Sequence, residues 1–122
     1  RIASAARADY AAAAAAVLTA SGDLAGRVFE LAGDAAYSLN ELAAEIARQS
    51  GKTVAYVNLP EADYKAALIG AGLPEPIAAL LTDSDAGAAK GGLFDDSHQL
   101  SALIGRPTTT IAASVAAALK AL

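Results

Sequence analysis

The chain has 122 residues, 55% of them apolar, with one His, no Cys and a net charge of −4 from nine Lys and Arg against thirteen Asp and Glu. That length allows one small domain and excludes two independent ones. The missing cysteines exclude disulfides, thiolate metal sites and a thiol nucleophile and favour a cytoplasmic protein, while the acidic balance disfavours nucleic-acid binding.

Three further features of the sequence limit the interpretation. Because 35 residues are Ala, the hydrophobic core must depend on the fewer Leu, Ile, Val, Phe and Tyr side chains. The uncharged stretch at residues 10–22 is too short to cross a bilayer, so we expect no membrane span and no signal peptide. The chain opens at Arg1 without an initiator Met, which suggests a piece of a longer protein.

The first part of the chain is predicted to form a helix followed by a strand. Asp9 precedes a run of good helix formers at residues 10–20, and its carboxylate is expected to cap them. An alanine-rich helix of this kind is typical of close packing against a sheet. Residues 28–31 are rich in β-formers and are followed by Gly33, which predicts a strand.

A second helix and a second strand follow. Ser38 and Glu41 have the spacing of a capping box, and Gly51 can take the left-handed conformation that ends the helix. Residues 54–57 belong to a stretch that alternates as a strand does. The intervening helix has the length of a right-handed crossover, so we expect residues 28–31 and 54–57 to pair in parallel.

Four more helices complete the predicted order, and they begin near Pro60, Pro74, Asp96 and Thr110. The helix after Pro74 is expected to bury Ile77, Leu80 and Leu81, and Asp96 is expected to cap the next one. The prediction is an α/β chain with about two parallel strands and six helices. Because two strands alone are marginally stable, the sheet should continue in another segment or in a second copy of the chain.

Few residues could carry chemistry. Gly70, Gly72 and the glycines of residues 87–92 follow helices rather than strands, so they do not predict a cradle for nucleotide phosphates. No Tyr has a Lys four residues later, a spacing that would lower the pKa of the phenol, and we expect packed rings with surface hydroxyls.

The densest polar cluster contains Asp95, Asp96 and His98. Its ordinary interpretation is a helix cap with His98 in the first turn, since a metal site would need further ligands at defined spacing. The alternative is that His98 or Phe94 lines a ligand pocket, because residues 90–95 are rich in glycine and join two helices. Asp83 and Asp85 are expected on a solvated face.

Five short motifs give a more specific indication, at residues 7–10, 29–34, 38–43, 90–94 and 103–109. In their order and spacing they resemble the C-terminal part of the NmrA-like atypical short-chain dehydrogenases, most closely the NAD(P)H:quinone oxidoreductase type 2 group. The resemblance covers nearly all of the chain but only about the last two fifths of such an enzyme.

The resemblance implies a reductase whose N-terminal Rossmann domain binds NADPH and whose smaller C-terminal lobe closes over a quinone. Residues 1–36 would then form the edge of the nucleotide-binding α/β domain, and residues 37–122 the substrate-binding lobe. The implied pocket wall is at Gly91, Gly92 and Phe94, with His98 as a further candidate. No catalytic, cofactor-binding or metal-binding residue carries over, so we expect the chain alone to be inactive and NADPH to be bound mainly upstream.

Two other functions stay open from the sequence. An NmrA-type regulator would bind a nicotinamide nucleotide and recruit a partner protein without catalysis. An assembly module would pair an open sheet edge with a second copy of the chain, a contact that unpaired strands favour.

Overall fold

The computed structural model describes residues 1–121, which contain six helices. Their bounds are α1 Arg7–Leu18, α2 Leu39–Ser50, α3 Glu61–Gly70, α4 Glu75–Ala89, α5 Gln99–Ile104 and α6 Ile111–Lys120. All six predicted helices are therefore confirmed. In this described part of the chain, no helix has the length and apolar character that crossing a membrane requires.

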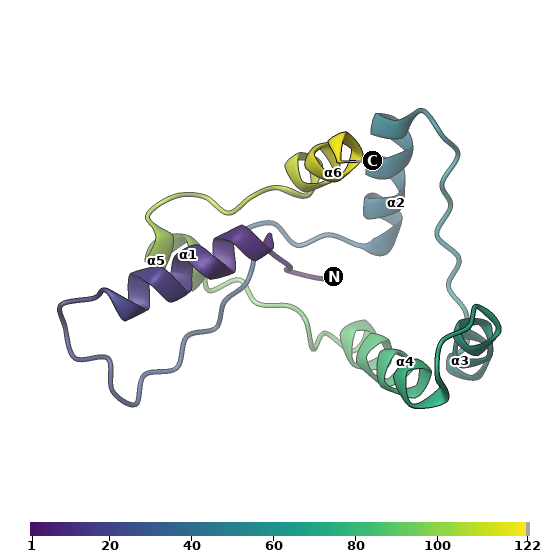
Figure 1. The fold of residues 1–122 in the computed structure, drawn as a ribbon, viewed down its shortest axis with the longest axis horizontal. Coiled ribbons are helices and arrows are strands. Elements are labelled where there is room, and N and C mark those ends of the chain that lie inside the picture. Colours follow the sequence, from purple (N-terminus) through teal and green to yellow (C-terminus); the bar gives the residue numbers. More distant parts are fainter. Residues whose placement is uncertain (122) are drawn as a thin grey trace.

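The helices pack in three pairs rather than around one common core. α1 packs on α5, α2 on α6 and α3 on α4, and Figure 1 shows these pairs as separate corners of the molecule. The chain exposes 8122 Å², whereas a compact monomer of its mass exposes roughly 6,000 Å². Large surfaces between the pairs are thus open to a ligand or to another polypeptide segment.

Short extended segments connect the pairs. Ile2 and Tyr37 form an antiparallel bridge with N–H to O distances of 2.8 and 3.0 Å. The next residue, Ala3, donates its N–H to the Leu93 carbonyl and accepts from the Gly33 N–H, both at 2.8 Å. The first residues of the chain therefore tie the segment before α2 to the segment before α5.

The two predicted strands are not found in residues 1–121. Residues 28–31 and 54–57 carry no regular ladder. Figure 1 places them on opposite sides of the molecule, the first in the long loop after α1 and the second between α2 and α3, so the predicted parallel pairing is wrong. Alternation indicates an extended backbone but does not say which segment supplies its hydrogen bonds.

The missing sheet changes two other expectations. The alanine-rich α1 packs on α5, where Ala13 and Leu100 are fully buried, instead of on a sheet. The small side chains of α1 let the two helices approach closely. A sheet edge that could pair with a second copy is likewise not formed in the part of the chain that the structure describes.

The helix ends follow local chemistry. The Ser38 hydroxyl accepts from the Glu41 N–H at 3.2 Å, and the Glu41 carboxylate accepts from the Ser38 N–H at 2.6 Å, so the predicted capping box is confirmed. Gly51 ends α2 and Gly105 ends α5, each with a φ of 68°. Thr110 caps α6 by accepting from the Ala113 N–H at 3.2 Å.

Three side-chain predictions are wrong. Asp9 lies inside α1 and is fully buried, so it does not cap that helix. Asp96 does not cap α5, which begins after His98 without a side-chain cap. The α4 side chains predicted to be buried, Ile77, Leu80 and Leu81, are exposed, and the buried ones are Ala78, Thr82 and Ala88. Helical periodicity distinguishes faces, but α4 places its small side chains inward and its larger ones outward.

Candidate functional site

The predicted pocket wall after α4 lies beside a small cavity of about 250 Å³. Gly92 and Phe94 line this cavity together with Tyr10, and Phe94 is half exposed. Gly91 does not line it, but its φ of 93° turns the chain at the end of α4. A Cβ on Gly92 would lie 3.0 Å from the Gly87 carbonyl oxygen, so a larger residue would press on the end of α4.

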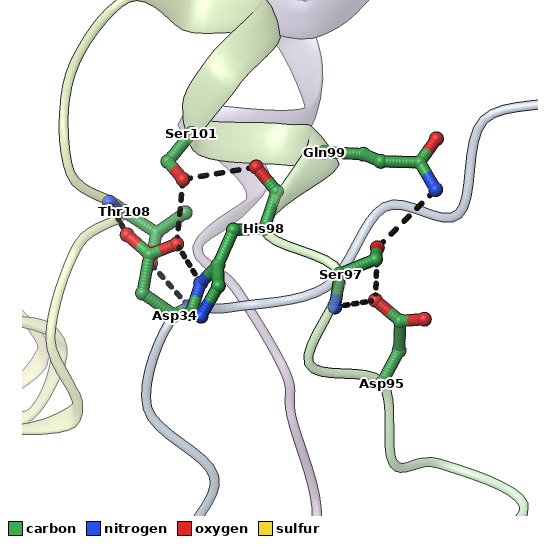
Figure 2. A network of polar contacts seen from close by, with 7 residues as sticks. All are labelled: Asp34, Asp95, Ser97, His98, Gln99, Ser101 and Thr108. Carbon is green, nitrogen blue, oxygen red and sulfur yellow. Dashed lines mark hydrogen bonds and ion pairs between the residues drawn. The ribbon is translucent and has the colours of Figure 1, made fainter.

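His98 lies outside that lining, in a polar network centred on Asp34 (Figure 2). Its Nδ1 is 3.0 Å from Asp34 Oδ1, which also accepts from Ser101 Oγ at 2.7 Å. Asp34 Oδ2 accepts from the Thr108 N–H at 2.8 Å. Hydrogen bonds from Ser101, Thr108 and His98 hold the pKa of Asp34 well below its usual range.

This network does not have the geometry of a nucleophilic or metal site. Ser101 Oγ donates to Asp34 and not to the His98 ring, and the lowered pKa of Asp34 makes that carboxylate too weak a base to activate the hydroxyl. Hydrogen bonds from the Oγ and N–H of Ser97, at 2.6 and 3.0 Å, lower the pKa of Asp95 and close a turn. Within residues 1–121, no group of three or more His, Cys, Asp or Glu could hold a metal ion.

Asp9 makes a second connection to the segment before α6. Its Oδ1 accepts from Arg106 Nη2 at 2.7 Å and from Thr109 Oγ1 at 3.1 Å, and its Oδ2 accepts from the Thr109 N–H at 2.7 Å. Burial raises the pKa of Asp9, but these hydrogen bonds and the charge of Arg106 outweigh burial and lower the pKa overall. We call Asp9, Asp34 and residues 106–109 the aspartate clamp.

A larger cavity of about 570 Å³ lies between the α3–α4 pair and the extended residues 56–60, and we call it the α3–α4 cavity. Tyr56, Tyr64 and Asp85 line it. The Asp85 carboxylate, together with burial, raises the pKa of the Tyr64 hydroxyl, which therefore stays protonated at neutral pH. The Tyr56 hydroxyl donates to Asn58 Oδ1 at 3.0 Å.

The α3–α4 cavity has the character of a small-molecule site. Its volume falls within the usual range, and its lining combines apolar side chains such as Leu39, Val57 and Leu59 with hydroxyl, amide and charged groups. Ile2 lines both this cavity and the smaller one beside Phe94, so the two are neighbours. A flat aromatic ligand suits such walls.

A third cavity, of about 560 Å³, lies between α2 and α6. Apolar side chains of these helices, including Leu42, Ile46, Val115 and Leu119, line it together with the segments that precede α1, α2 and α6. Its Asp34 and Thr108 groups already bond to one another in the aspartate clamp. Such a cavity offers apolar surface but few free polar groups that could orient a ligand.

The sequence did not predict that Tyr64 and Asp85 are neighbours. Asp85 is exposed, as predicted, whereas Tyr64 is half-buried beside it. The available signal was the short connection between α3 and α4, residues 71–74, because such a connection forces two helices into an antiparallel hairpin and brings distant positions together.

The glycine turns of the described residues do not fit the phosphates of a nicotinamide nucleotide. Gly72 and Gly91 have φ values of 94° and 93° and follow the C-terminal ends of α3 and α4. A helix C-terminus presents carbonyl oxygens and the negative end of its dipole, which disfavour a phosphate.

No protein-family model matches this chain, but known proteins are similar to it in both sequence and fold. The chain is 63% identical over 115 residues to Quinone oxidoreductase 2 of Escherichia coli (strain K12), a match that covers 94% of the chain and 40% of that relative. The predicted resemblance to the quinone oxidoreductase type 2 group is confirmed.

Solved structures of reductases extend this likeness. The crystal structure of the NADPH-dependent quinone oxidoreductase QOR2 from Escherichia coli matches with a TM-score of 0.92 and 61% sequence identity. The match covers 97% of this chain and 42% of the QOR2 chain. The triphenylmethane reductase of Citrobacter sp. matches with a TM-score of 0.89 and 31% sequence identity. That match covers 98% of this chain and 41% of the reductase chain. The chain thus spans about two fifths of the length of the relatives that it matches.

Proposed function

We propose that this chain forms the quinone-binding part of an NADPH-dependent quinone reductase. The observation that carries the proposal is the 63% identity to Quinone oxidoreductase 2 over 94% of the chain. The TM-scores to two kinds of reductase support it, and they do not favour a regulator without catalysis. In such a reaction NADPH supplies a hydride and solvent supplies a proton, so that the quinone becomes a hydroquinone.

The proposed quinone site is the α3–α4 cavity, with the smaller cavity beside Phe94 at its border. The apolar walls would hold a flat ring and exclude water from it. Gly92 and Phe94 would form the outer wall, and Gly91 would set the turn that positions them. His98 would act less directly, by holding this segment to Asp34.

We propose that NADPH is held mainly by the part of such a reductase that the match does not include. The glycine turns at the ends of α3 and α4 support this assignment of NADPH binding, because they do not suit phosphates. The large exposed area supports contact with a further segment, a pairing that we favour over one with a second copy. The chain alone would then be inactive, and a cytoplasmic location stays a prediction from its cysteine-free composition.

Residues 1–36 would lie at the edge of the nucleotide-binding domain, and residues 37–122 would form the substrate lobe. The aspartate clamp crosses this boundary, because Asp9 and Asp34 bind residues 106–109. We propose that the clamp fixes the lobe relative to that domain.

A chimeric enzyme tests the proposed function. In Escherichia coli Quinone oxidoreductase 2, the matched 115 residues would be replaced by those of this chain, and oxidation of NADPH would be followed with 1,4-benzoquinone. The proposal predicts quinone-dependent oxidation of NADPH. A chimera that folds and binds NADPH but reduces no quinone, beside an active parent enzyme, would contradict it.

A further inference from the structure

We propose that Asp85 makes the α3–α4 cavity select neutral quinones over anionic ones. The inference rests on the proposed quinone site, and it assigns a specificity role to a side chain in the wall of that cavity. Asp85 would not react with the quinone. It would set which quinones can enter, through the charge that it places beside the ring.

The hydroxyl donors around Asp85 already have acceptors. Tyr56 donates to Asn58 Oδ1 at 3.0 Å, and Thr82 Oγ1 donates to the Ala78 carbonyl at 2.8 Å. The Tyr64 hydroxyl lies beside the Asp85 carboxylate. Near Asp85 the wall therefore presents an anionic ligand with a negative charge and with hydroxyls whose protons already have acceptors. The other polar groups of the lining include the side-chain amides of Asn40 and Asn58.

The other charged groups of the lining are Arg1, Glu61 and Lys90. The guanidinium of Arg1 binds the Ala36 carbonyl and the Glu41 carboxylate, so its charge is largely matched within the protein. Glu61 adds a second carboxylate. Lys90 is the cation that could attract an anion, and it lies at the C-terminal end of α4, more than one turn beyond Asp85.

A sulfonate on the ring would bring a fixed negative charge near Asp85, whose side chain is exposed to water at the edge of the cavity. In such a nearly water-like environment, repulsion between two charges about 4 Å apart corresponds to roughly a five- to tenfold loss of affinity. A neutral ring of the same size avoids this loss.

Calorimetric titration of the full chain with 1,4-naphthoquinone and with 1,4-naphthoquinone-2-sulfonate tests the inference. The absence of cysteine keeps the quinones from adding to thiols. We expect the neutral quinone to bind about tenfold more tightly. Asp85→Asn should narrow this ratio to about twofold by strengthening sulfonate binding, while Asp83→Asn, on the same helix but outside the cavity lining, should leave it unchanged.

The outcomes separate the inference from the proposed function. The role of Asp85 is overturned if the unmodified chain binds the two quinones with equal affinity. It is also overturned if Asp85→Asn and Asp83→Asn change the ratio of the two affinities equally at unchanged helicity. In both cases quinone binding itself stands. A ratio that responds to Lys90→Gln and not to Asp85→Asn overturns it as well. A chain that binds neither quinone removes the proposed quinone site, and the inference falls with it.

Discussion

The N–H of Thr109 donates to Oδ2 of Asp9 over 2.7 Å, although the two residues are 100 positions apart in the chain. The preceding N–H, that of Thr108, donates to Oδ2 of Asp34 at 2.8 Å. Two carboxylates from different segments thus hold consecutive amides of the connection between α5 and α6. This aspartate clamp joins the beginning of the chain to its last helix.

Replacing Asp9 by Ala should lower the free energy of unfolding by about 2–4 kcal/mol, because Arg106 and the Thr109 N–H lose a buried acceptor. Urea unfolding measures the change. Asp63→Ala, at an exposed position of α3, is the control and should alter stability by less than about 0.5 kcal/mol. Similar losses in the two variants would mean that the clamp contributes little.

Stability should fall as the pH decreases below about 4–5, because the pKa of Asp34 in the folded chain lies below its ordinary value of 3.8. A carboxylate of this kind stabilises the fold above its unfolded pKa, and the contribution is lost as the pH falls toward the folded pKa. Thermal unfolding followed by circular dichroism between pH 7 and pH 3 should therefore give a shallower decline for Asp34→Asn. Parallel curves for the two proteins would contradict this account.

Gly33→Ala should destabilise the chain by about 1–3 kcal/mol, because a Cβ there would overlap the backbone carbonyl of Ser4. The Gly33 N–H bonds to the neighbouring Ala3 carbonyl, so the two segments cannot separate freely. Gly22→Ala is the matched control, since nothing lies within 4 Å of the added Cβ. A comparison of melting temperatures checks the difference, and equal melting temperatures would refute the close approach.

Ser38→Ala should cost about 1 kcal/mol, because the N–H of Glu41 loses its acceptor and the capping box opens. Chemical denaturation measures this loss. Ser84→Ala, at an exposed position inside α4, should cost nothing, since Ala favours a helix more than Ser does. A neutral Ser38→Ala would show that the box does not hold α2.

Part of the local chemistry was predictable from the sequence, although the caps predicted at Asp9 and Asp96 are wrong, and long-range pairing was not predictable. The capping box at Ser38 and the helix end at Gly51 depend on residues within a few positions, and both are confirmed. The strands at residues 28–31 and 54–57 depend on a distant partner, and their pairing is wrong. Burial on α4 also failed, because Ala78 rather than Leu80 is buried in the three-pair arrangement.

The same distinction between local features and long-range contacts applies to the candidate site. The glycine-rich composition indicated the turn at Gly91, and the family resemblance implied a wall at Gly92 and Phe94, which line a small cavity. The pairing of Tyr64 with Asp85 arises when α3 packs on α4, and that of His98 with Asp34 when two loops meet. No short-range pattern contains either pair.

Separate calorimetric titrations of the chain with 1,4-naphthoquinone and with NADPH test the central claim most directly. A chain that holds the acceptor site but no phosphate cradle should bind the quinone and show no heat with NADPH. Micromolar binding of NADPH together with no binding of the quinone would contradict the account.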